Sequence, residues 1–201
     1  MTRLTCRRVV VAGAAAAAGL AVLSPGKHVH AQTQTKPTGV TPAELAKHEK
    51  FMRLAIAQAN LNPGRPFGSV LVDDRSGEVV GAGVANLAAS PLFHSEVQAM
   101  NAYLAKNGNK GWENLTMYGT GEACPMCASA MVWAGIPRMV YGSDTPFVRQ
   151  YIADINIRAK DVAEAGKAIY TSKLLLGGVL ANETDKLFEA KSKIGEKKVA
   201  G

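Results

Sequence analysis

Two short motifs constrain the fold of this 201-residue chain more than any other feature. The first is His94-Ser95-Glu96 and the second is Cys124-Pro125-Met126-Cys127. Each motif is weak evidence alone, because a lone His-x-Glu arises by chance and a lone Cys-x-x-Cys also occurs in redox pairs and disulfides. Together they offer one imidazole and two thiolates, the number of protein ligands typical of a catalytic zinc with an open fourth position. A fold that uses both motifs must bring two distant segments to one point.

The elements expected around the motifs place both of them at helix starts. The sequence predicts a helix over 94–106, a strand over 115–118, a helix from 125 to just before 135, and a strand over 139–141. Two helix N-termini then face the metal, and their positive ends stabilise the cysteine thiolates. Glu96 is too close to His94 to chelate the same ion comfortably, but it can reach a water bound there. That is the position of a general acid/base.

The N-terminal part of the domain carries helix and hairpin signals. Thr41-Pro42-Ala43-Glu44 has the form of a capping box and predicts an amphipathic helix to about Asn60. Valine-rich runs at 67–72 and 79–84, joined by turn residues, predict a hairpin. His48 lies on or near the apolar stripe of the first helix, and we interpret it as a core-edge histidine and not as a ligand.

The segment after Asp144 has weaker signals. It predicts a helix over 162–168, a strand over 174–176 and a closing helix over 182–194 with Asn182 as its cap. The overall β-β-α-β-α-β order implies a central sheet with helices packed on its faces, which is the α/β class.

The first 31 residues have the composition of an export signal. A basic start is followed by an uncharged, alanine-rich run over 9–23 and by small residues at Val29-His30-Ala31, where a signal peptidase would cut. A membrane anchor is the alternative, but a span needs about 20 predominantly apolar residues. We therefore expect a signal over 1–31, a flexible tether over 32–40 and a single domain over 41–201, located in the periplasm or secreted. Arg7-Arg8 resembles a twin-arginine signal, although Cys6 stands where that pattern usually has Ser or Thr, which leaves the ordinary secretory route open.

Removal of this signal changes the charge argument. The whole chain has 23 basic and 16 acidic residues, a net charge of +7. Four of the basic residues and none of the acids lie in 1–31, so the mature balance is 19 minus 16, or +3. Nucleic-acid binding requires a clustered basic face, and no stable binding is expected here. We also expect no membrane contact after the signal is removed.

The combined motifs resemble the signature of zinc-dependent nucleobase deaminases, in which H-x-E is followed by P-C-x-x-C. The similarity is closest to guanine deaminases and tRNA adenosine deaminases of the cytidine and deoxycytidylate deaminase superfamily. It extends to the strand over 66–72, to Asn86, and to the 177–183 segment, so that it covers about residues 45–193. The resemblance implies a three-layer α/β/α cytidine-deaminase-like fold with a mixed sheet of about five strands. We also expect a homodimer.

The resemblance implies a zinc ion held by His94, Cys124 and Cys127, with Glu96 as the catalytic residue. The reaction would be metal-assisted hydrolysis of a free nucleobase or nucleoside, with guanine or a related purine favoured and ammonia released. The residues expected to bind the substrate are Phe67, Asn86, Ser95, Trp133 and Asp144. Phe67 and Trp133 either stack a purine or belong to the core, and Asn86 either bonds the substrate or forms a turn.

Three departures from the family pattern bear on this interpretation. Ala123 stands where the family has Pro, Ser95 replaces the usual Ala, and the stretch from Asn86 to His94 is shorter than in the family.

Two alternative functions also stay open. In one, Cys124 and Cys127 form a disulfide or redox pair on a vestigial deaminase scaffold in an oxidising compartment. In the other, the protein acts on tRNA, against which the low mature charge and the export signal both argue.

Overall fold

The computed structural model describes residues 37–199, with side chains described as far as Lys191. The predicted export signal and residues 32–36 of the predicted tether lie outside the described residues. In chain order the elements are α1 (Pro42–Ala59), β1 (Gly68–Asp73), β2 (Glu78–Val84), α2 (Ser95–Asn107), a 3-10 turn η1 (Trp112–Asn114), β3 (Leu115–Gly121), α3 (Pro125–Ala134), β4 (Arg138–Ser143), α4 (Thr145–Val148), α5 (Ala159–Ala165), β5 (Leu174–Leu176) and α6 (Ala181–Val199).

The strands form one mixed, five-stranded sheet in the order β2-β1-β3-β4-β5. β1 pairs antiparallel with β2 and with β3, whereas β3, β4 and β5 run parallel. Parallel neighbours need crossover connections, which α3 supplies between β3 and β4, and α4 with α5 between β4 and β5. The α/β class and the mixed five-stranded sheet predicted from the sequence are confirmed.

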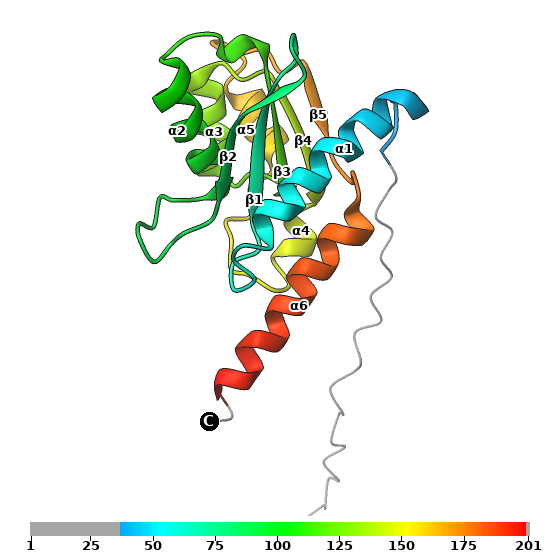
Figure 1. The fold of residues 1–201 in the computed structure, drawn as a ribbon, viewed down its shortest axis with the longest axis vertical. Coiled ribbons are helices and arrows are strands. Elements are labelled where there is room, and N and C mark those ends of the chain that lie inside the picture. Colours follow the sequence, from blue (N-terminus) through cyan, green and yellow to red (C-terminus); the bar gives the residue numbers. More distant parts are fainter. Residues whose placement is uncertain (1–36, 200–201) are drawn as a thin grey trace, which may run out of the picture. The chain divides into compact units, whose positions relative to one another are not determined.

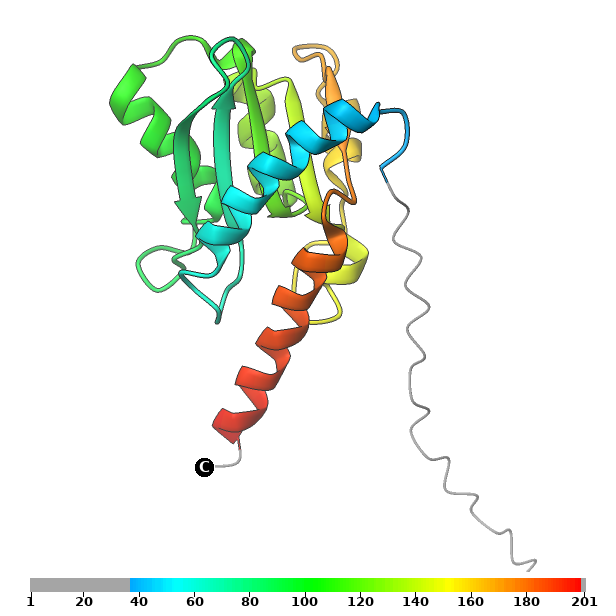
Figure 2. The ribbon, with the colours of Figure 1, turned by 45° about the vertical axis from the view of Figure 1, so that its right-hand side comes forward.

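Successive side chains of each strand point to opposite faces of the sheet, so the core has two layers. Val70, Tyr118 and Val140 face α1 on one side of the sheet. Residues one position away along the same strands, such as Met117 and Met139, pack with residues of α2 and α3 on the other side. Figures 1 and 2 show α1 and α6 on the first face and α2, α3 and α5 on the second. The domain is therefore a three-layer α/β/α structure.

Two glycines of β2 allow α2 to lie unusually close to the sheet. A Cβ atom built on Gly83 would lie 2.2 Å from the carbonyl oxygen of Ser95, and one on Gly81 would lie 2.4 Å from that of Ala99. Both distances are below any van der Waals contact, so only glycine fits at these positions. The backbone of β2 thereby sets the position of the first turns of α2.

Several local predictions can be compared directly with the structure. The capping box at Thr41 is present, since its hydroxyl accepts from the Glu44 amide at 3.3 Å and the Glu44 carboxylate accepts from the Thr41 amide at 2.8 Å. The predicted cap of the closing helix is wrong by two residues. α6 begins at Ala181, because Leu180 has a left-handed backbone with φ of 54° and its carbonyl accepts the first helical bonds. Asn182 therefore lies inside the first turn.

His48 lies on the α1 face, where its Nδ1 is 3.0 Å from the Tyr118 hydroxyl. It is half-buried at the edge of the core, as the sequence predicted. Among residues 37–199, no helix combines the length and the apolar character that crossing a membrane requires.

Candidate functional site

His94 and Glu96 lie at the start of α2. His94 is the residue immediately before the helix and has an extended backbone, with φ of −72° and ψ of 157°. Its ring is half-buried, whereas Glu96 is only 4% exposed. Because Gly83 packs against the carbonyl of Ser95, strand β2 determines where both side chains begin.

Cys124 and Cys127 lie at the start of α3. Cys124 precedes the helix with an extended backbone, and Pro125 occupies the first helical position, where its fixed φ suits the helix and its missing N–H costs no hydrogen bond. Cys127 follows in the first turn and is fully buried. Both are free cysteines, which gives no support to the predicted alternative of a disulfide.

The two helix starts bring one nitrogen and two sulfur ligands together. The ligand atoms of His94, Cys124 and Cys127 all lie within 4.8 Å of one another. Cys124 Sγ is 3.5 Å from His94 Nδ1. Zn–S and Zn–N bonds at a tetrahedral angle would separate a sulfur and a nitrogen ligand by about 3.6 Å. The donor set and its spacing therefore fit a zinc ion with three protein ligands.

The thiols and the imidazole polarise one another. The Cys127 thiol donates a hydrogen bond to Cys124, and this bond, with the neighbouring His94, lowers the pKa of Cys124 to about 4. The same bond, together with burial, raises the pKa of Cys127. The hydrogen bond with Cys124 also raises the pKa of His94. A thiolate thus forms readily at Cys124, which is the form that a metal ion binds.

Glu96 is a buried carboxylate held by a chain of hydroxyl groups. Burial, followed by the nearby Cys124 sulfur, raises its pKa above the ordinary value of 4.5. The Ser95 hydroxyl donates to Glu96 Oε2 at 3.0 Å, and the Ser69 hydroxyl donates to Ser95 at 2.8 Å. A carboxylate whose pKa is raised toward neutrality can both accept and release a proton.

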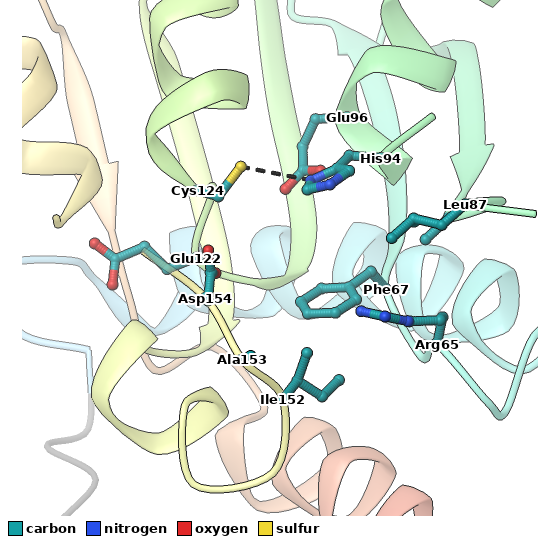
Figure 3. A pocket seen from close by; sticks show the side chains of 11 residues that line it. Arg65, Phe67, Leu87, His94, Glu96, Glu122, Cys124, Ile152, Ala153 and Asp154 are labelled. Atoms are coloured by element: carbon teal, nitrogen blue, oxygen red, sulfur yellow. Dashed lines mark hydrogen bonds between the residues drawn. The ribbon is translucent and has the colours of Figure 1, made fainter. Parts of the chain in front are cut away.

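A cavity of about 250 Å³ opens beside the metal ligands (Figure 3). Its lining residues are Arg65, Phe67, Ala85, Leu87, His94, Glu96, Glu122, Cys124, Ile152, Ala153 and Asp154. In Figure 3 Cys124, His94 and Glu96 lie on one side, with Phe67 and Arg65 opposite the 152–154 segment. One small space therefore contains two of the three metal-binding residues, the acid/base candidate and an aromatic ring.

The structure separates the five predicted substrate-binding residues. Phe67 lines the cavity and packs against Phe188, with ring centroids 5.1 Å apart. The other four do not line it. The Ser95 hydroxyl is hydrogen-bonded to Ser69 and to Glu96.

Asn86, Asp144 and Trp133 have other environments. The Asn86 side chain accepts from the Ala89 amide at 3.4 Å, which favours the turn interpretation. Asp144 caps α4 by accepting from the Phe147 amide at 2.9 Å. Trp133 is 80% exposed near the end of α3, so it lies neither in the core nor in the cavity of this chain. Both interpretations of Trp133 required burial, and the sequence contains no signal that this position of the helix faces outward.

Asp154 is the main lining residue that the sequence analysis missed. Its carboxylate accepts from the Ile155 amide at 2.7 Å, and burial raises its pKa. Asp154, Ile152 and Ala153 lie between α4 and α5, in a segment without regular secondary structure. Arg65 and Leu87 were missed for the same reason, since loop residues follow no period that would mark them as facing a common space.

Residues 45–143 match the family model of the cytidine and deoxycytidylate deaminase zinc-binding region. The chain belongs to this zinc-dependent deaminase family. The family segment contains His94, Glu96, Cys124 and Cys127, and it ends before Asp154. It therefore includes the whole deaminase metal site but only part of the cavity.

Known deaminases of different specificity resemble this one. The chain is 32% identical over 103 residues to guanine deaminase of Bacillus subtilis, a match that covers 48% of this chain and 65% of that protein. It is 32% identical over 107 residues to tRNA-specific adenosine deaminase of Streptococcus pyogenes, covering 51% and 66%. The matches thus span slightly under two thirds of these relatives. The solved structure of guanine deaminase from Nitrosomonas europaea has the same fold, with a TM-score of 0.61, 20% identity, and coverage of 80% of this chain and 90% of that one.

Proposed function

We propose that this deaminase hydrolyses the exocyclic amine of a free nucleobase or nucleoside, with guanine or a related purine as its preferred substrate. The observation that carries the proposal is the shared cavity, which is lined by His94, Cys124, Glu96, Asp154 and Phe67 together. Ligand pockets commonly range from about 300 to 1,000 Å³, so a space of about 250 Å³ suits a single base better than a larger molecule.

Each residue of the site has a distinct role in hydrolysis. His94, Cys124 and Cys127 would hold a zinc ion, which when bound would supply the Lewis acidity that lowers the pKa of water. Glu96 accepts the proton of the attacking water, because its buried carboxylate lies beside His94 and Cys124 in the cavity, whereas that of Glu122 is turned away. It then delivers protons to the ring nitrogen and to the departing amine, which leaves as ammonia. The Ser95 hydroxyl holds one oxygen of Glu96 and orients the other.

Asp154 supports guanine over the other common bases. A carboxylate is an acceptor with two oxygens, and guanine presents two adjacent donors, the ring N1–H and the 2-amino group. Adenine and cytosine have no such pair of donors beside the carbon that carries their amine. Phe67 provides an aromatic face at the other side of the cavity, on which a purine can stack.

The direct test is a screen for released ammonia with zinc-loaded protein. Guanine, adenine, cytosine and their nucleosides are the substrates, and Glu96→Ala is the control for contaminating activity. Guanine is expected to give the highest kcat/KM. Turnover of cytosine or adenine alone would refute the argument that Asp154 accepts from the N1–H and 2-amino groups of guanine. Absence of activity on every free base and nucleoside would refute the proposed activity.

The location and the oligomeric state form a separate proposal. We infer from the sequence that the domain is exported after cleavage near Gln32, and that it forms a homodimer. The exposed Trp133 supports the second point, because large aromatic side chains are enriched in interfaces. Cell fractionation with N-terminal sequencing tests export, and an intact Met1 in the cytoplasm would refute it. Sedimentation of wild type and Trp133→Ser tests the dimer, which the substitution is expected to weaken.

A further inference from the structure

Glu122 is a buried carboxylate that joins three segments of the domain. Only 4% of the residue is exposed. Its Oε2 accepts from the amide and the hydroxyl of Thr145, both at 3.0 Å, and from Arg158 Nε at 2.6 Å. Its Oε1 accepts from the Ala159 amide at 3.0 Å. Thr145 is the first residue of α4 and Ala159 is the first residue of α5, so one side chain ties both helix starts to the end of β3.

The two helices enclose the segment that carries Asp154. Residues 149–158 have no regular secondary structure, yet they supply three lining residues of the cavity. Within the segment, the Asp154 carbonyl accepts from Arg149 Nε at 3.2 Å. Glu122 holds the chain on both sides of the segment, at Thr145 in the first turn of α4 and at Ala159 directly after residue 158. The position of Asp154 therefore depends on contacts made at both ends of the segment.

Arg158 completes this arrangement from the end of the same segment. Besides Glu122, its guanidinium approaches the Tyr141 hydroxyl at 3.4 Å and the Asp144 carboxylate at 3.8 Å. The Arg158 side chain is 27% exposed, whereas that of Glu122 is 1% exposed. In Figure 3 the Glu122 carboxylate is turned away from Phe67 and the centre of the cavity. Glu122 thus contributes to the wall of the cavity while its charged end is turned toward Arg158, which does not line the cavity.

We propose that Glu122 and Arg158 are positioning residues for substrate recognition, which hold Asp154 at a fixed distance from the metal ligands. Glu122 lies two residues before Cys124 and directly after β3, so its contacts with Thr145, Arg158 and Ala159 join the metal-binding loop to both sides of the 149–158 segment. The pair acts on the substrate through Asp154 and does not act on the metal. The inference rests on the proposed function for its kinetic consequence only.

The test replaces Arg158 with Met and compares it with a matched ion pair elsewhere. Arg138 Nη1 is 2.8 Å from Asp74, and the Arg138 side chain is also 27% exposed, but this pair lies at the opposite end of β4 and does not line the cavity. Arg158→Met is expected to raise KM for guanine roughly 10- to 100-fold, the loss of activity typical when the hydrogen-bond partners that orient metal ligands are replaced. It should change kcat and zinc content little, and Arg138→Met should leave KM unchanged.

A second measurement is independent of any substrate. Hydrogen exchange of the backbone amides of 149–158 in zinc-loaded protein should be faster in Arg158→Met than in wild type or Arg138→Met, with the 95–107 helix unchanged. If Arg158→Met does not fold, Arg158→Lys and Glu122→Gln provide milder variants. Arg158→Lys keeps the positive charge, so it should raise KM less than Glu122→Gln does.

The outcomes separate this inference from the proposed function. Unchanged exchange together with unchanged KM overturns the positioning role. Loss of zinc in a folded Arg158→Met also overturns it, because the pair would then support the metal-binding loop. If hydrogen exchange of 149–158 is faster in Arg158→Met but the wild type is inactive on every base, the positioning role of Glu122 and Arg158 is supported. The substrate assignment is then refuted instead.

Discussion

The two sides of the cavity are built in different ways. One side, which we call the metal wall, consists of His94, Glu96 and Cys124, all at the starts of regular helices. The other, the loop wall, consists of Ile152, Ala153 and Asp154, in a segment without regular structure. Helix starts fix the metal wall locally, whereas contacts with the distant Glu122 fix the loop wall. Under the proposed function, the chemical step and the choice of substrate belong to separate parts of this domain.

A substitution in the metal wall should have the largest effect. Glu96→Ala removes the group that moves protons, and loss of a general acid/base typically costs about 10²- to 10⁴-fold in rate. We expect kcat to fall by this factor with zinc content retained, as measured by ammonia release and elemental analysis. Ser95→Ala is the control, because it removes the hydroxyl that bonds Glu96 and Ser69 but leaves the Glu96 carboxylate in place, so it should cost less than Glu96→Ala. Substantial activity in Glu96→Ala would refute its role.

The matching substitution in the loop wall should act on binding and not on the chemical step. Asp154→Asn replaces one acceptor oxygen with a donor, and a hydrogen bond to a charged group contributes about 1.5–3 kcal/mol. We expect KM for guanine to rise about 10- to 150-fold with a smaller change in kcat. Asp73→Asn is the control, since Asp73 pairs with Arg75 at the end of β1 and does not line the cavity. Equal effects of the two substitutions would remove Asp154 from substrate recognition.

Protonation of Asp154, in the loop wall, should weaken substrate binding under acidic conditions. Burial, and to a lesser degree the Cys124 sulfur, raises the pKa of Asp154 above its ordinary value of 3.8. The carboxylate accepts the guanine donors only when ionised, so affinity is lost as the pH falls through this raised pKa. Binding of an unreactive guanine analogue, measured by calorimetry at several pH values, should weaken at higher pH than an ordinary Asp would cause. Asp154→Asn should lack this dependence, and an identical profile in both proteins would contradict the assignment.

The smallest expected effect concerns the aromatic face of the cavity. Phe67→Leu keeps an apolar side chain against Phe188 but removes the stacking surface. Aromatic pairs contribute about 0.5–1.5 kcal/mol beyond area burial, so KM for guanine should rise about 2- to 12-fold. Phe51→Leu, on the α1 face of the sheet, tests whether a general loss of packing has the same result. No change in KM with Phe67→Leu would leave Phe67 as a structural residue alone.

The metal wall could be predicted from sequence because its signals are local. The His-x-Glu and Cys-x-x-Cys spacings, together with Pro125 at a helix start, identify ligands and their geometry without knowledge of the rest of the fold. The first strands and the first helix were also predictable from local signals. Valine-rich runs mark β1 and β2, and a capping box marks the start of α1. The short helix α4 was missed, as four residues are too few to show a helical period.

The loop wall could not be predicted for a physical reason. Asp154 lies between two helices, α4 and α5, whose first residues bond Glu122, and these contacts join residues more than twenty positions apart. Asn86, Asp144 and Trp133 were selected by their positions relative to family motifs, and such positions do not define which way a side chain points. The Trp133 side chain is exposed on the surface instead, and the Asp144 side chain caps α4.

Gly81 and Gly83 have a consequence for redesign of this enzyme scaffold. Since a methyl group at either position would collide with the backbone of α2, the first turns of that helix cannot be moved without rebuilding the strand beneath them. Mutant libraries that randomise residues 86–93 and 149–157 leave both glycines in place. Such libraries can therefore explore new amine-bearing heterocycles while the register of the metal-binding side chains is inherited unchanged.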